Sequence, residues 1–253
     1  MKRLRLALVM FLSLTFLSGC IPMRNNRLWL ETRLGRSAEK VYPTKNLYEL
    51  FDKFPKGFTI IVMDSYKKDG IYMYRKIWLY GSPEKKRIEG YVSLRKEDDL
   101  VEHVNLVYSQ NGKLSAENSN YSDELLPYKE FLFQKLTLNK KVLSKLKLIS
   151  KSYSWVSGYG DIEYGIKDKD INKFLHLDKD EEVTMSINTE DSVVSDSGFF
   201  LPISFSQNEL ESWHKETIIG GQEGKIMTNT RSSISVLNIH NLALLPDLQE
   251  SEG

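Results

Sequence analysis

The sequence contains a single cysteine, Cys20, among its 253 residues. The rest of the chain therefore holds no disulfide, and thiolate catalysis and zinc–thiolate sites are excluded there. The four histidines stand singly, and none belongs to the H-E-x-x-H pattern of zinc enzymes. The sequence thus predicts neither a metal nor another cofactor. We interpret the histidines as surface or core-edge residues: His103, His176, His214 and His240.

Neither sign of charge dominates, since 35 basic residues face 34 acidic ones. Nucleic-acid-binding domains are usually strongly basic, so we expect no nucleic-acid partner. The G-x-S-x-G pattern of serine hydrolases is also missing. The segment from Gly220 to Lys225 is one residue too short between its glycines to be a phosphate-binding loop. We therefore predict a protein without enzymatic activity.

No segment after the first twenty residues is long and apolar enough to span a membrane. At the N-terminus, a basic head is followed by an apolar run over residues 6–17. At a helical rise of about 1.5 Å per residue this run reaches about 18 Å, short of the roughly 30 Å hydrocarbon core of a bilayer. A basic head, a short apolar run and small residues after it are typical of a signal peptide, which we place at residues 1–19.

The signal peptide ends in Leu17-Ser18-Gly19, and Cys20 follows directly. These four residues resemble the lipobox of bacterial lipoproteins. The resemblance implies a diacylglycerol on the sulfur of Cys20, cleavage before it, and acylation of the new amine. The expected partners are then the membrane, the prolipoprotein lipidation enzyme and signal peptidase. The alternative is an ordinary signal peptide with an incidental cysteine.

Cleavage before Cys20 leaves 234 residues with a net charge of −2. This length suits one large domain or two small ones. We expect a lipidated tether over residues 20–27 and a single extracytoplasmic domain over residues 28–253. Whether residues 206–253 belong to this domain or form a divergent, partly ordered C-terminal extension stays open.

Apolar residues at intervals of three and four predict helices at residues 28–39, 47–54, 139–149 and 170–177. Runs of β-branched and aromatic residues predict strands at residues 58–63, 71–80, 88–94, 101–108, 183–187, 199–205 and 234–239. Short polar turns such as Asp69-Gly70 separate the first four strands. Such turns join antiparallel neighbours. We therefore predict an α+β fold, with an antiparallel meander and a few short packing helices in a single domain.

Two surface features of the sequence are open to more than one interpretation. Tyr72, Tyr74, Trp78 and Tyr80 have the same parity, so their side chains share one face of a strand. They either pack in the core or form an exposed platform that binds a sugar or a protein. The second feature is a run of six lysines without an acid over residues 135–151. This run is either a solvated face or a contact with anionic lipid or wall polymer.

Several segments together resemble the staphylococcal tandem lipoprotein family. In that family a tyrosine-proline pair and a lysine-asparagine-leucine helix open the domain, and a β run and a strand–basic turn–strand unit follow. The corresponding segments here are Tyr42–Lys53, Lys56-Gly57, Ile77–Tyr80 with Lys85–Arg87 and Gly90–Val92, and Gly160–Ile162 with Asp168 and Asp170.

This resemblance implies an α+β surface lipoprotein of low-GC Gram-positive bacteria, with no assigned enzymatic activity or cofactor. The roles proposed for the family are contact with host cells and innate immune stimulation through the lipid. A host receptor or host protein is then a further expected partner. Two other functions stay open: a solute- or polymer-binding envelope lipoprotein, and an envelope hydrolase built from residues such as His103, His176 and the acids near Asp161.

Overall fold

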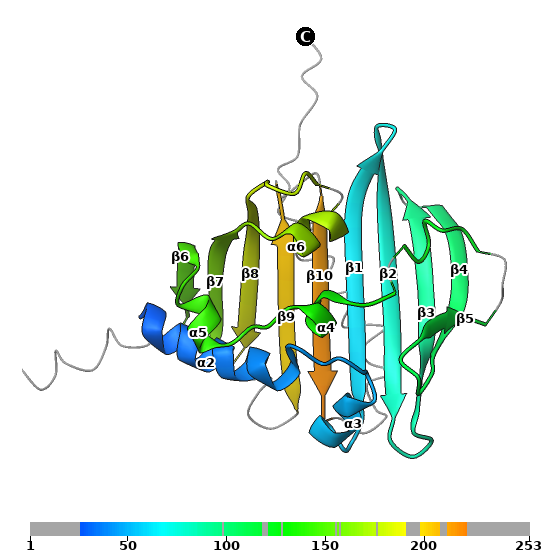
Figure 1. Cartoon of the computed structure of the whole chain (residues 1–253), viewed down its shortest axis with the longest axis horizontal. Coiled ribbons are helices and arrows are strands. Elements are labelled where there is room, and N and C mark those ends of the chain that lie inside the picture. The colour runs from blue at the N-terminus through cyan, green and yellow to red at the C-terminus, as the bar shows by residue number, and fades with distance from the viewer. Residues whose placement is uncertain are drawn as a thin grey trace, which may run out of the picture.

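The computed structural model describes residues 26–221, except 98, 118–120, 128, 155, 157, 176, 191–197 and 208–211. In this part of the chain, a single antiparallel sheet of ten strands carries its helices on one face (Figure 1). The strand order is β5-β4-β3-β2-β1-β10-β9-β8-β7-β6. None of the described helices is long and apolar enough to cross a membrane.

The sheet consists of two five-stranded meanders that meet at its centre. One meander runs outward from β1 to β5, and the other runs inward from β6 to β10, so that β1 pairs with β10. The first five strands are β1 (Phe58–Lys68), β2 (Ile71–Ser82), β3 (Arg87–Lys96), β4 (Asp99–Tyr108) and β5 (Leu114–Ala116). The last five are β6 (Lys147–Tyr153), β7 (Tyr159–Ile166), β8 (Val183–Glu190), β9 (Phe199–Ser206) and β10 (Trp213–Gly220).

The meander predicted for the first four strands is confirmed, but it is one part of a much larger sheet. The helix predicted over residues 139–149 is wrong. Only one turn forms, α5 (Lys140–Leu143), and the chain then enters β6. Leu146 and Leu148 fit a period of two as well as a helical one. Pairing with β7, where Lys147 lies opposite Gly165, favours the strand.

Strand β10 was not predicted, and it lies in the middle of the sheet. Its residues pair with β1 from Phe58 opposite Gly220 to Ser65 opposite Trp213. Residues 213–220 are therefore a central strand and not part of a C-terminal extension. The strand predicted at residues 234–239 lies outside the described residues.

The helices all lie on the same face of the sheet (Figure 1). Their bounds are α2 (Arg27–Val41), α3 (Glu49–Lys53), α4 (Leu132–Lys135), α5 and α6 (Lys169–Phe174). Helix α2 begins after Asn26, whose side chain accepts the N–H of Leu28. It ends before Tyr42, which adopts an extended conformation as expected of a residue before proline. These features match the helix predicted over residues 28–39.

The core lies between the helices and the sheet. Ile77 and Leu79 of β2 are fully buried in this core, and so are Leu30 and Leu34 of α2. Burying one such aliphatic side chain contributes about 2 kcal/mol. The alternate residues of β2 lie on the opposite face, where the described part of the chain places no helix (Figure 1). We call this second face the aromatic face.

Candidate functional site

The aromatic residues of β2 lie on the aromatic face. Leu79 is buried against the helices, whereas its neighbours Trp78 and Tyr80 are half-buried on the other side and Tyr74 is 40% exposed. The rings stack in two pairs, Tyr72 with Tyr74 at 6.4 Å and Trp78 with Tyr80 at 6.3 Å between centroids. The interpretation that these rings pack in the core is therefore wrong, and they form part of a surface.

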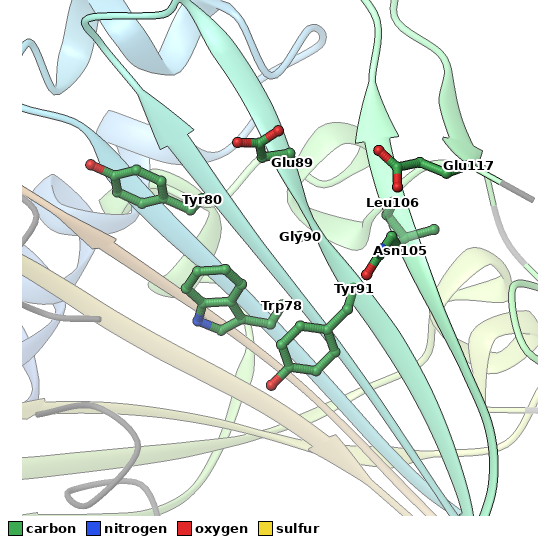
Figure 2. Close-up of a pocket in the computed structure, with 8 residues that line it drawn as sticks. All are labelled: Trp78, Tyr80, Glu89, Gly90, Tyr91, Asn105, Leu106 and Glu117. Atoms are coloured by element: carbon green, nitrogen blue, oxygen red, sulfur yellow. The ribbon is translucent and has the colours of Figure 1, made fainter. Parts of the chain in front are cut away.

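Trp78 and Tyr80 line a groove that β3, β4 and the residue after β5 complete (Figure 2). We call it the aromatic groove. Its volume is about 300 Å³, at the lower end of the range for ligand pockets. Tyr91 of β3 lies opposite Trp78 in register, and the two rings stack at 5.8 Å with an interplanar angle of 19°. The groove is lined by Trp78, Tyr80, Glu89, Gly90, Tyr91, Asn105, Leu106 and Glu117.

A glycine allows the two aromatic strands to approach each other. A Cβ atom on Gly90 would lie 1.8 Å from the carbonyl oxygen of Trp78, far inside any non-bonded contact. Glycine within a strand often marks such a close approach of two backbones. Because Gly90 has no side chain, β3 packs tightly on β2 and Tyr91 can stack on Trp78. The sequence alone did not reveal this role of Gly90.

The rim of the aromatic groove is polar. Arg87 holds two carboxylates there, with its Nε 2.8 Å from Glu89 Oε2 and its Nη2 3.6 Å from Glu117 Oε1. These exposed ion pairs contribute little to stability, but they orient the two acids. The backbone N–H of Glu117 donates to the carbonyl oxygen of Asn105 at 3.0 Å, which fixes the chain after β5. Carboxylates accept hydrogen bonds, and the Asn105 amide both donates and accepts them.

A second cluster of polar side chains lies on the helix side of the sheet, inside the core. Arg75, Asp64 and His214 are directly opposite one another on β2, β1 and β10. Arg75 Nη1 donates to Asp64 Oδ2 at 2.6 Å, and two further guanidinium N–H groups donate to the carbonyl oxygen of Glu124 at 2.7 and 3.1 Å. His214 donates from Nδ1 to Asp64 and from Nε2 to Glu216 Oε1, the latter at 3.1 Å. We call these residues the buried ionic cluster.

Glu216 connects the buried ionic cluster to the helix layer. Its carboxylate oxygens accept the backbone N–H groups of Leu132 and Phe133, at the start of α4, at 2.6 and 2.8 Å. The hydroxyl of Tyr42 also donates to it at 3.5 Å. Burial first, and the charge of Glu216 second, raise the pKa of Tyr42. Glu216 therefore fixes both α4 and the end of α2 to the centre of the sheet.

The interpretation of His214 as a surface or core-edge residue is wrong, because its side chain is only 1% exposed. The sequence carries no signal for this position, because Ile218 and Ile219 are both apolar and have opposite parities. In the structure, the buried Ile218 has the same parity as His214 and Glu216, and all three lie on the core side. The cavity beside Asp64 and Arg75 measures about 10 Å³, room for about one water molecule. The buried ionic cluster is thus structural.

Protonation of His214 should make the stability of the domain depend on pH. Burial alone would lower the pKa of His214, but Asp64 and Glu216 outweigh it and raise this pKa from 6.5 to about 9. The contribution of the charged imidazole is therefore complete below about pH 6.5 and is lost as the pH rises through 9. We expect the free energy of unfolding, measured by urea titration, to fall by roughly 3 kcal/mol across this interval.

The variant His214→Gln should flatten this pH dependence, because glutamine has no proton to lose there. His103 of β4 is exposed, so His103→Gln serves as the matched control and should keep the wild-type pH profile. Equal profiles for His214→Gln and the wild type would show that the imidazole is not the titrating group.

The sheet does not bring together His103 and Asp161, two of the residues suggested for a hydrolase site. His103 on β4 and Asp161 on β7 are seven strand positions apart, which is roughly 33 Å along the sheet. His176 lies outside the described residues. Within residues 26–221, as far as they are described, no group of three or more histidine, cysteine or acidic side chains could hold a metal ion.

The residues of the lipobox, Leu17, Ser18, Gly19 and Cys20, lie outside the described residues. Lipidation at Cys20 therefore stays a prediction from the sequence.

Comparisons with known proteins identify no family. No known family model matches the chain, and no curated protein matches it. Among solved structures, LprF from Mycobacterium bovis is similar, with a TM-score of 0.37 and 9% sequence identity over 74% of this chain and 93% of that protein. At this TM-score the likeness supports no conclusion about fold or function. The resemblance to the staphylococcal tandem lipoproteins stays a prediction.

Proposed function

We propose that this chain is a non-enzymatic lipoprotein of the bacterial envelope, anchored through Cys20, whose aromatic groove binds a glycan. The observation that carries the binding proposal is the stack of Trp78 on Tyr91 beneath a rim of two carboxylates and an amide (Figure 2). The anchor rests on the signal peptide and the lipobox. This proposal selects the polymer-binding alternative left open by the sequence.

The chemistry of the aromatic groove complements a sugar ring. A pyranose presents C–H groups on its faces and hydroxyl groups around its edge. The faces of Trp78 and Tyr91 carry negative electrostatic potential and attract such C–H groups. Glu89, Asn105 and Glu117 at the rim can then bind the hydroxyl groups. Apolar surface with a few placed polar groups is the usual composition of a ligand site.

A nucleic acid is a poorer ligand for the same groove. Bases also stack on aromatic side chains, but most of the affinity for nucleic acids comes from lysines and arginines that neutralise several phosphates. At the rim, the two carboxylates of Glu89 and Glu117 share one cation, Arg87, so these three groups together carry a net negative charge. The near balance of charge over the whole chain also argues against a nucleic-acid ligand.

The anchor places the domain close to the membrane. The first described residue, Asn26, follows Cys20 by six positions, and a chain of this length spans no more than roughly 22 Å. A domain held at this distance meets the glycans of its own envelope first. We therefore propose an envelope polymer as the ligand.

Replacing Trp78 by alanine should weaken binding to the cell wall. The experiment uses residues 20–253, the mature chain expected after cleavage, made lipid-free by Cys20→Ser, and measures its sedimentation with purified Gram-positive cell-wall sacculi. Removing a tryptophan at the centre of a binding site typically costs about 2 kcal/mol or more, so Trp78→Ala should reduce affinity about tenfold or more.

Tyr121→Ala is the control for this experiment, because Tyr121 is 37% exposed and lies outside the aromatic groove. It should bind sacculi as the wild type does. A wild-type chain that does not sediment with sacculi, or a Trp78→Ala variant that sediments equally well, would rule out the proposed function.

A further inference from the structure

A pair of half-buried lysines lies next to the aromatic groove, on the same face of the sheet. Lys76 precedes Trp78 by two residues in β2, and Lys215 lies on β10. Both are opposite Met63 of β1, which lies between them. Their Cα atoms are thus two strand spacings apart, about 10 Å. Each side chain is long enough to reach a group held above Met63.

Neither lysine has an ionic partner among the described residues. Their other neighbours at the same register level are uncharged, Ser93 beside Lys76 and Ser204 beside Lys215. Burial, and then the charge of Arg95, lower the pKa of Lys76, and burial lowers the pKa of Lys215. Half-buried cations without a counter-ion are costly, and an anionic ligand would remove that cost.

On the aromatic face, acidic, aromatic and basic side chains follow one another in a fixed order along the strands. Glu89 and Tyr91 on β3 are two residues apart, and so are Trp78 and Lys76 on β2, with Tyr91 opposite Trp78. Successive steps of two residues are about 6.6 Å. The aromatic face therefore presents a carboxylate, then a pair of stacked rings, then a cation. A ligand that fits it has hydroxyl groups at one end, a ring in the middle and an anion at the other end.

We propose that the aromatic groove and the lysine pair together bind a phosphate-bearing glycan, with a sugar ring on Trp78 and Tyr91 and a phosphate between Lys76 and Lys215. This inference rests on the proposed function and names its class of ligand. Two ammonium groups that approach from opposite sides suit a tetrahedral phosphate, since lysine binds phosphate as a point charge. A planar carboxylate is better matched by the fork of an arginine.

The test compares two kinds of sacculi with two forms of the lipid-free mature chain. One sample of Gram-positive sacculi keeps its phosphodiester-linked glycans, and the other has lost them after treatment with hydrofluoric acid. The double variant Lys76→Met, Lys215→Met keeps the length and apolar stems of the side chains. We expect the wild type to bind native sacculi at least about tenfold more tightly than stripped ones, a preference that salt weakens. The double variant should lose this preference.

The control is a second double variant, Lys85→Met, Lys113→Met, which removes two exposed lysines near turns and changes the net charge equally. It should keep the wild-type preference. An equal loss in both double variants would mean a bulk-charge effect and would overturn the inference. Circular dichroism checks that each variant is folded, and Lys76→Gln alone replaces the double variant if that one is not.

The remaining outcomes separate the two proposals. Equal wild-type binding to native and stripped sacculi would overturn the phosphate assignment and leave glycan binding intact. No binding to either would remove the proposed function as well. Vesicles of phosphatidylglycerol offer a phosphate from a lipid headgroup. Binding to these vesicles as tight as to native sacculi, and unchanged by Trp78→Ala, would overturn the glycan assignment.

Discussion

Replacing Glu216 by alanine is expected to lower the free energy of unfolding by about 4 kcal/mol, the range for breaking a buried charge pair. The side chain is fully buried, and the alanine leaves four donors without their acceptor. These are the backbone N–H groups of Leu132 and Phe133, the hydroxyl of Tyr42 and the Nε2 of His214. Because domains of this kind are stable by only about 5–15 kcal/mol, the variant should be close to unfolding.

Urea unfolding of the lipid-free mature chain, followed by circular dichroism, measures this change. The matched control is Glu163→Ala on β7, where the carboxylate accepts a hydrogen bond from the exposed hydroxyl of Ser150 at 2.7 Å. Loss of that exposed contact should cost about 1 kcal/mol or less. A Glu216→Ala variant no less stable than Glu163→Ala would show that α4 is not fixed to the sheet by this carboxylate.

Replacing Cys20 by serine in the full-length chain is expected to abolish membrane retention. Each buried methylene of an acyl chain contributes about 0.8 kcal/mol, and a single chain is marginal, so two or three chains give stable anchoring. Serine offers no thiol for the diacylglycerol. The variant should appear in the soluble fraction or in the medium, with the fold of the domain unchanged.

Membrane fractionation with metabolic palmitate labelling measures both effects. Since Cys20 is the sole cysteine, the label cannot move to another thiol in the variant. Label and retention in the wild type alone would establish the anchor. A variant that stays membrane-bound after a salt wash would contradict the lipobox prediction, and an unlabelled wild type would indicate a secreted protein.

The local parts of this fold could be predicted from the sequence. Strands β1 to β4 are joined by short turns such as Asp69-Gly70, and turns of this kind allow one arrangement, an antiparallel meander. Helix α6, which apolar spacing predicted over residues 170–177, begins at an aspartate cap, Asp168. In these cases the information lies within a few residues of the element it determines.

The centre of the sheet could not be predicted in the same way. Strand β10 contains His214, Lys215 and Glu216, and three consecutive ionisable residues do not resemble a buried strand. Its position depends on Asp64 and on the N–H groups at the start of α4, which are far away in the sequence. Polar partners of this kind override local β-propensity, and no short-range pattern contains them.

The candidate site was predictable in part. The parity of Tyr72, Tyr74, Trp78 and Tyr80 placed them correctly on one face of one strand. The position of the helices determines which face of the sheet this is. The shape of the groove depends on residues of three other segments: β3, β4 and the chain just after β5. The tight packing at Gly90 in particular follows from an atomic distance that composition cannot show.

The pairing of the first strand with the last described one determines when the fold can close. Strand β1 is synthesised early, yet its partner on one side is separated from it by 150 residues at the pair Asp64 and His214. Contacts of such long range form slowly, because a long loop must close first. Until residues 213–220 have been synthesised, β1 therefore has one unpaired edge. An edge of this kind is a site for aggregation, so the pairing of β10 with β1 also protects the chain from aggregation.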